Sequence, residues 1–150
     1  LVEAGRRSDA RARLQAVVDG AGEASTELRR EVWLSLAELE LLEGQWRQAE
    51  VIADRLLLRE ADDVGALQLK ARALQAVGAI EAAQRAANRA AELSPVPSVR
   101  WLQASIMAAS PDRAERLRAL ELAQQADLRQ LEAGLVEALQ AELHLGLGHY

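Results

Sequence analysis

Small and apolar residues recur along this chain at the spacing of helices, not of strands. One segment, from Gly78 to Pro95, reads GAIEAAQRAANRAAELSP. Within it Ala83, Ala87 and Ala90 stand at i, i+4 and i+7, which places them on one stripe of an α-helix. A glycine permits a left-handed turn before this helix, and a proline cannot continue it. The segment therefore predicts a helix with a small-residue face and two defined ends.

The same pattern occurs 34 residues earlier. At this interval the counterparts of Gly78, Ala83, Ala87, Ala90 and Pro95 are Gly44, Ala49, Ala53, Leu56 and Ala61. Towards the C-terminus the loop ASPDRAERLRAL adds two residues, and the small residues arrive late, at Ala119, Ala123 and Ala126. Towards the N-terminus Gly5, Ala10, Leu14 and Val17 keep the internal offsets. A period of this length predicts stacked helix pairs, because each pair leaves an apolar edge that only a neighbour can bury.

The pattern places helices at the following ranges: 8–19, 27–43, 46–59, 64–77, 80–93, 98–109, 111–126 and 129–146. Asp62-Asp63 and Ser110-Pro111-Asp112 supply start signals for the fourth and seventh. We expect one domain over residues 1–150. It divides into a partial repeat 1–26, repeats 30–63 and 64–97, a divergent repeat 98–133 and a partial repeat 134–150.

The segment WLSLAELELLEGQWRQAEVIADRLLLREA resembles a tetratricopeptide repeat, and LQLKARALQAVGAIEAAQRAANRAAELSP resembles the end of one more closely. The matching residues are Trp33, Leu36, Ala37, Gly44, Trp46 and Ala49 in the first segment, and Ala83, Ala90 and Pro95 in the second. Two departures are Glu40 in place of the usual tyrosine and Ala53 in place of a bulky residue. The resemblance implies an all-α fold, an α-α superhelix: a right-handed solenoid of antiparallel helix pairs.

Composition narrows the function class. The formal net charge is −5 and the pI near 5.1, whereas a nucleic-acid-binding domain needs a basic footprint. The chain has no cysteine and no run approaching the ~20 apolar residues that span a bilayer. A single lysine among many arginines indicates a GC-rich bacterial genome, with the compartment, cytoplasm or periplasm, left open.

The sequence offers no pattern for catalysis, cofactors or metals. His144 and His149 are five residues apart, not the i, i+4 spacing of paired ligands on a helix. The GLGHY ending lacks the lysine of a phosphate loop, and no serine sits in a nucleophile elbow. The arginines of GRRSDARAR, together with Arg29 and Arg30, form a basic front end. This region is either a contact for an acidic partner or phosphate, or a solvated surface paired with Glu23, Glu27 and Glu31.

In a solenoid of this kind the first helix of each pair lines the concave side. Removing the packing stripe of each first helix leaves a predicted binding groove of Glu31, Leu34, Glu38, Leu41, Gln68, Arg72, Gln75, Leu102, Ile106 and Glu142. Four of these are expected as exposed apolar contacts: Leu34, Leu41, Leu102 and Ile106. Family members that clamp a peptide carboxylate carry Lys, Asn and Arg where this chain has Leu34, Glu38, Leu69 and Leu102, so that clamp is not predicted.

We therefore expect a non-enzymatic scaffold that binds a protein or peptide in the groove, such as an amphipathic helix or an extended segment carrying Leu and Arg or Lys. The groove positions could instead pack against further repeats or a second copy, because a cut solenoid end exposes an apolar face and favours end-to-end association. Two alternatives stay open. One is a structural spacer or assembly arm of an envelope or polysaccharide-export protein; the other is a regulatory module of an enzyme outside this segment.

Overall fold

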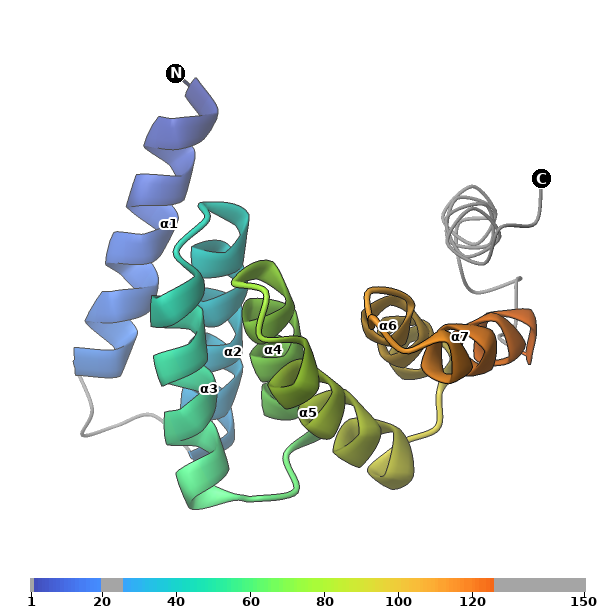
Figure 1. Ribbon diagram of the computed structural model, residues 1–150. Coiled ribbons are helices and arrows are strands. Elements are labelled where there is room, and N and C mark those ends of the chain that lie inside the picture. The colour runs from blue at the N-terminus through green and yellow to red at the C-terminus, as the bar shows by residue number, and fades with distance from the viewer. Residues whose placement is uncertain (1, 20–25, 126–150) are drawn as a thin grey trace.

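A computed structural model describes residues 2–19 and 26–125 of the chain. All regular structure in these ranges is α-helical (Figure 1). The helices are α1 Val2–Asp19, α2 Thr26–Leu42, α3 Trp46–Arg59, α4 Val64–Ala76, α5 Ile80–Leu93, α6 Pro97–Ala108 and α7 Arg113–Gln125. The bounds predicted for α2 to α7 are confirmed to within two residues, and the helix expected at 129–146 lies outside the described residues.

The first helix differs from its prediction. The sequence pattern placed this helix at 8–19, with Gly5 ahead of it at the offset of the other repeat glycines, but α1 begins at Val2 and runs through Gly5. A Cβ added at Gly5 would meet nothing within 4 Å, and only Gly44 and Gly78 have positive φ among the described residues. Gly5 is therefore an ordinary helical residue, and its match to the repeat offset does not mark a turn.

Successive helices pack against one another in two rows (Figure 1). We call α2, α4 and α6 the inner row and α1, α3, α5 and α7 the outer row. Neighbouring helices of the inner row contact each other, α2 with α4 and α4 with α6. Neighbouring helices of the outer row stay more than 8 Å apart between backbones. This arrangement is all-α and consistent with a helical-repeat superhelix, in which the inner row has the smaller radius.

The predicted small-residue stripes are the contact surfaces between helices. Ala83, Ala87 and Ala90 on α5 are fully buried, as are Ala49 and Ala53 on α3. Their side chains join the clusters that bind α3 to α2 and α4, and α5 to α4 and α6. Because alanine adds only a methyl group, the helix backbones can approach closely at these positions. Ala119 and Ala123 on α7 are also fully buried, which confirms the later arrival of the stripe in that repeat.

The turns within the first two complete pairs have the same geometry 34 residues apart. Gly44 has φ 77° and Gly78 has φ 81°. After α2 the Gln45 N–H donates to the Glu40 carbonyl at 2.8 Å, and after α4 the Ala79 N–H donates to the Leu74 carbonyl at 2.9 Å. These bonds satisfy carbonyls left open at the helix ends, and the left-handed residue is a glycine because it carries no Cβ. The left-handed turn allowed for at Gly78 is confirmed.

Two predicted start signals cap their helices. The Asp63 carboxylate accepts a hydrogen bond from the Ala66 N–H at 3.1 Å at the beginning of α4. The Asp112 carboxylate accepts one from the Ala114 N–H at 2.9 Å ahead of α7, and the Ser110 hydroxyl oxygen accepts one from the Asp112 N–H at 3.1 Å. Each cap satisfies a backbone donor that has no partner within the helix.

Candidate functional site

A groove lies between α4 and α6 in the inner row, with a volume of about 310 Å³. We call it the inner groove, and its lining residues are Gln68, Arg72, Gln75, Ser98, Trp101, Leu102 and Ser105. Gln68, Arg72 and Gln75 stand at i, i+4 and i+7, so they form one stripe of α4. The structure therefore brings together the three α4 positions that were predicted for the groove and one α6 position, Leu102.

The inner groove is polar with a partly apolar floor. Arg72 is exposed, supplies the only formal charge in the lining, and forms no ion pair with another described residue. The Ser105 hydroxyl donates to the Leu102 carbonyl at 2.8 Å. The indole nitrogen of Trp101 is buried and has no acceptor among the described residues. Guanidinium, amide and hydroxyl groups of this kind can hydrogen-bond a peptide backbone or polar side chains.

The lining contains few ionisable groups. It holds no carboxylate, imidazole or thiol that could act as a general base or nucleophile. Across the part of the chain that the structure describes, no three His, Cys, Asp or Glu side chains are grouped to hold a metal ion. The groove offers hydrogen-bonding amides and hydroxyls, one positive charge and an aromatic ring.

Three predicted groove residues of α2 lie apart from the inner groove. Glu31 and Glu38 are exposed and Leu34 is half-buried. The Leu34 side chain packs against α4, where a Cβ added at Gly65 would come within 3.3 Å of its Cδ2. Glu31 accepts a hydrogen bond from Arg30 at 2.8 Å. None of the three lines the space between α4 and α6.

The expectation that Leu41, Leu102 and Ile106 are exposed is wrong. Their side chains are 6%, 8% and 0% exposed. Leu41 belongs to the cluster that joins α2, α3 and α4, and the other two belong to the cluster that joins α4, α5 and α6. The prediction gave each inner-row helix a single packing stripe, but these helices also contact one another and so bury a second stripe. Leu102 still borders the inner groove, and Glu142 lies outside the described residues.

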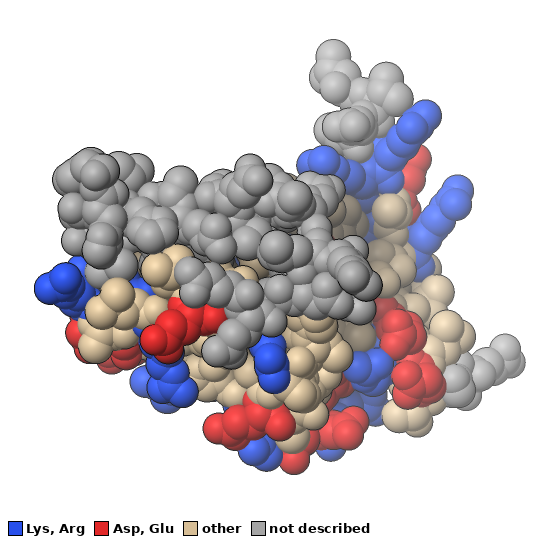
Figure 2. Space-filling model, turned by 90° about the vertical axis from the view of Figure 1, so that its right-hand side faces the viewer, with Lys and Arg blue, Asp and Glu red and all other residues tan. Residues whose placement is uncertain are grey.

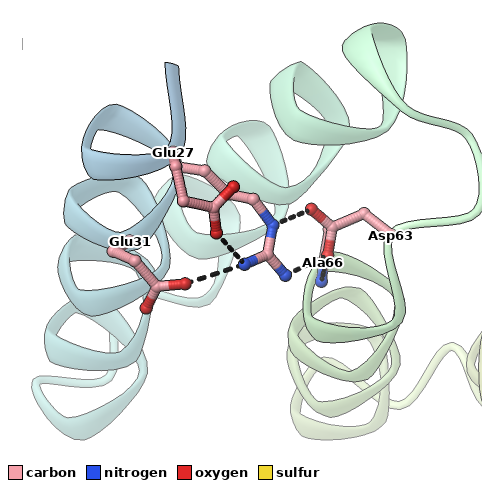
Figure 3. Close-up of polar contacts among 5 residues, drawn as sticks. Glu27, Glu31, Asp63 and Ala66 are labelled. Atoms are coloured by element: carbon pink, nitrogen blue, oxygen red, sulfur yellow. Dashed lines mark hydrogen bonds and ion pairs between the residues drawn. The ribbon is translucent and has the colours of Figure 1, made fainter. Parts of the chain in front are cut away.

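Arg30 connects α2 to the start of α4 (Figure 3). Its Nε donates to Asp63 Oδ2 at 2.7 Å and its Nη2 to Asp63 Oδ1 at 3.0 Å, while Nη1 contacts Glu31 at 2.8 Å and Glu27 at 3.4 Å. Burial opposes ionisation of Asp63, but the bonds from Arg30 and from the Ala66 N–H outweigh it and lower the pKa of the carboxyl. Of the two interpretations of these arginines, pairing with Glu27 and Glu31 is observed for Arg30, Glu23 lies outside the described residues, and the ion pair with Asp63 was missed.

Glu40 stands where a tetratricopeptide repeat usually has a tyrosine, and an arginine of the neighbouring helix explains how an acidic residue is accommodated there. Glu40 is buried in α2, and its carboxylate accepts hydrogen bonds from Arg11 of α1 at 2.9 and 3.1 Å. The same guanidinium also contacts Glu43. A buried carboxylate requires a cation or several donors, so an acidic residue at a packing position was the signal that a basic partner lay nearby. Its identity depends on how α1 packs on α2, which the local pattern does not specify.

The three tryptophans are all partly exposed. Trp33 and Trp101 are half-buried at the edges of their clusters. Trp46 is exposed at the start of α3, where its ring lies 3.7 Å from the position of a Cβ added at Gly44. Each ring therefore packs on one side and meets solvent on the other, so it can contribute to a surface.

The surface carries both signs of charge. Figure 2 shows Lys and Arg side chains interspersed with Asp and Glu over the described part of one face. No helix within the described ranges combines the length and the apolar character needed to cross a bilayer. Compared with protein-family models, with curated proteins and with solved structures, the chain finds no match.

Proposed function

We propose that this chain is part of a tetratricopeptide-like scaffold that binds a segment of another protein in the inner groove and has no catalytic activity of its own. The observation that carries the proposal is the convergence of Gln68, Arg72 and Gln75 of α4 with Trp101 and Leu102 of α6 around one groove. These residues come from two consecutive repeats, so the groove depends on the stacking of helix pairs.

The burial of Leu41 and Ile106 changes the expected partner. A leucine-rich helix would find few apolar contacts here, because only Leu102 and the half-buried Trp101 ring border the groove. An extended segment can instead use its backbone carbonyls and polar side chains against Gln68, Gln75 and Arg72. Since the α4 and α6 helices hold these groups in place before binding, little conformational entropy is lost on the scaffold side.

The test is selection of peptides from a random library displayed on phage, using the full chain as bait. Selected peptides are synthesised and titrated against wild type, Arg72→Glu and the matched control Arg85→Glu. Arg85 is exposed on α5 and does not line the inner groove. Binding weakened at least tenfold by Arg72→Glu and unchanged by Arg85→Glu supports the proposal. Equal binding to all three proteins would contradict it and favour the spacer hypothesis.

A further inference from the structure

A second groove lies on the opposite row, between α1 and α3 above α2. It consists of two adjoining pockets of about 360 and 320 Å³ that share Trp33 and Arg55. We call it the outer groove. The first pocket is lined by Gln15, Trp33, Leu36, Glu40, Arg47, Gln48, Val51, Ile52 and Arg55. The second is lined by Val18, Arg29, Trp33, Arg55, Leu56, Leu58 and Arg59. No inner-groove residue takes part.

One stripe of α3 runs the length of the outer groove. Arg47, Val51, Arg55 and Arg59 stand four residues apart, so neighbouring members are adjacent on the helix surface and the stripe winds by about 120° from Arg47 to Arg59. At 1.5 Å per residue the stripe is about 18 Å long. The Arg55 guanidinium lies over the Trp33 ring, 5.6 Å from its centroid, and this cation–π contact holds the middle of the stripe in place.

The outer groove is positively charged in an acidic protein. No ion pair joins Arg47, Arg55 or Arg59 to a carboxylate within the described residues. The one carboxylate in the lining, Glu40, is already bound by Arg11. The chain as a whole carries a formal charge of −5. The stripe therefore offers three cationic groups to a partner, and their sign is opposite to that of the chain.

Apolar side chains alternate with these cations. Leu58 is 87% exposed and Val51 is 51% exposed, both on α3, and Val18 of α1 is half-buried across the second pocket. Water-exposed leucine and valine beside arginine suit a surface that buries aliphatic groups of a partner while pairing with its carboxylates. A phosphate backbone would leave these aliphatic groups unused, so the lining favours a protein over a nucleic acid.

We propose that the outer groove binds an acidic amphipathic helix of a partner protein. Its carboxylates, spaced about one helical turn apart, pair with Arg47, Arg55 and Arg59, and its leucine or valine side chains pack against Val51 and Leu58. Charge complementarity selects this occupant: the groove is cationic where the rest of the chain is acidic. This interaction is separate from the inner groove, so one scaffold can engage two partners on opposite sides.

The probe is a fluorescein-labelled helical peptide of about four turns with glutamate at every fourth position and leucine on the adjoining stripe. Its affinity for the full chain is measured by fluorescence anisotropy. We expect binding that weakens as salt rises from about 50 to 200 mM, because exposed ion pairs are screened. The variant Arg55→Glu/Arg59→Glu should lower the affinity at least tenfold, while Arg85→Glu/Arg113→Glu, with the same charge change on exposed residues of α5 and α7, should not.

Control variants and further measurements test the outer groove as the binding site. Folding of each variant is checked by circular dichroism, and Arg55→Gln/Arg59→Gln replaces the charge reversal if that variant unfolds. Arg72→Glu should leave the probe's affinity unchanged, which separates this site from the inner groove. Equal loss in both double variants, or tighter binding of a DNA or RNA oligonucleotide than of the peptide, would overturn the proposal. So would a dimer in analytical ultracentrifugation that dissociates in Arg55→Glu/Arg59→Glu, because the occupant would then be a second copy.

Discussion

Truncation of Ile106 distinguishes the packing observed here from the surface position expected of this residue. Ile106 is fully buried between α4, α5 and α6, whereas an exposed groove residue would tolerate the change. Ile106→Ala removes three carbon atoms, each worth about 0.8 kcal/mol of transfer free energy, or roughly 2.4 kcal/mol together. The cavity left behind raises the loss of unfolding free energy to about 3–4 kcal/mol. Leu58→Ala, at an 87% exposed position, should change it by less than about 0.5 kcal/mol.

Urea unfolding followed by circular dichroism at 222 nm measures the difference. With a denaturant slope of about 2 kcal/mol/M, Ile106→Ala should lower the midpoint by roughly 1.5–2 M, and Leu58→Ala by about 0.25 M or less. Stacked helix pairs can unfold separately, so amide exchange of α6 is measured alongside. Ile106→Val should cost only about 0.5–1.5 kcal/mol. Midpoints that coincide for Ile106→Ala and Leu58→Ala would show that α6 does not pack on α4 and α5 as described.

Three further predictions use the same unfolding assay. Gly78→Ala should lower the free energy of unfolding by about 1–2 kcal/mol, because φ at Gly78 is +81° and the space around an added Cβ is open. Gly5→Ala inside α1 should raise it by roughly 0.5–1 kcal/mol. A change of the same sign in both variants would contradict the turn geometry at Gly78. Asp63 has a lowered pKa in the folded state, so its stabilisation is present above the unfolded pKa of about 3.9 and is lost as pH falls through the folded pKa. The difference in unfolding free energy between wild type and Asp63→Asn should therefore become smaller below about pH 4. A difference that stays constant from pH 7 to 2 would refute the ion pair between Arg30 and Asp63. Arg11→Met should lower the free energy of unfolding, because it leaves the Glu40 carboxylate buried without its cation. The double variant Arg11→Met/Glu40→Leu should recover most of that loss. No recovery would show that the arginine acts by packing alone.

The features that repeat along the sequence were predictable. Gly44, Gly78 and the alanine stripes recur at fixed intervals, and each has a local physical requirement: a left-handed turn or a close helix contact. Helix bounds follow from these markers with little need for tertiary information. Gly5 shows the limit, because an isolated glycine on a polar segment is compatible with both a turn and a helix interior.

Side chains whose environment involves three helices were not predictable. Ile106 is buried because α4 and α6 touch, a contact that depends on the angle between successive pairs and leaves no period in the sequence. The Arg30–Asp63 and Arg11–Glu40 pairs join helices of different pairs and occur once each, so no repeat offset reveals them. The outer groove was missed because three of its four arginines lie on α3, whereas groove positions were sought only on first helices; Arg29 of α2 was considered only as part of the basic front end.

The backbones of neighbouring inner-row helices approach more closely than those of neighbouring outer-row helices, and this difference determines how the array can bend. Distances along the inner row are fixed by touching side chains, so the array resists compression there. The backbones of the outer-row helices lie farther apart, although Gln84 of α5 donates a hydrogen bond to Glu115 of α7 at 2.9 Å, so bending about the inner row changes the spacing of α3, α5 and α7 first. The curvature of the array and the spacing between α3 and α5 therefore change together. Any molecule that spreads α3 from α5 must also bend the array at the contact between α2 and α4, and the stiffness of that contact sets the free energy of the change.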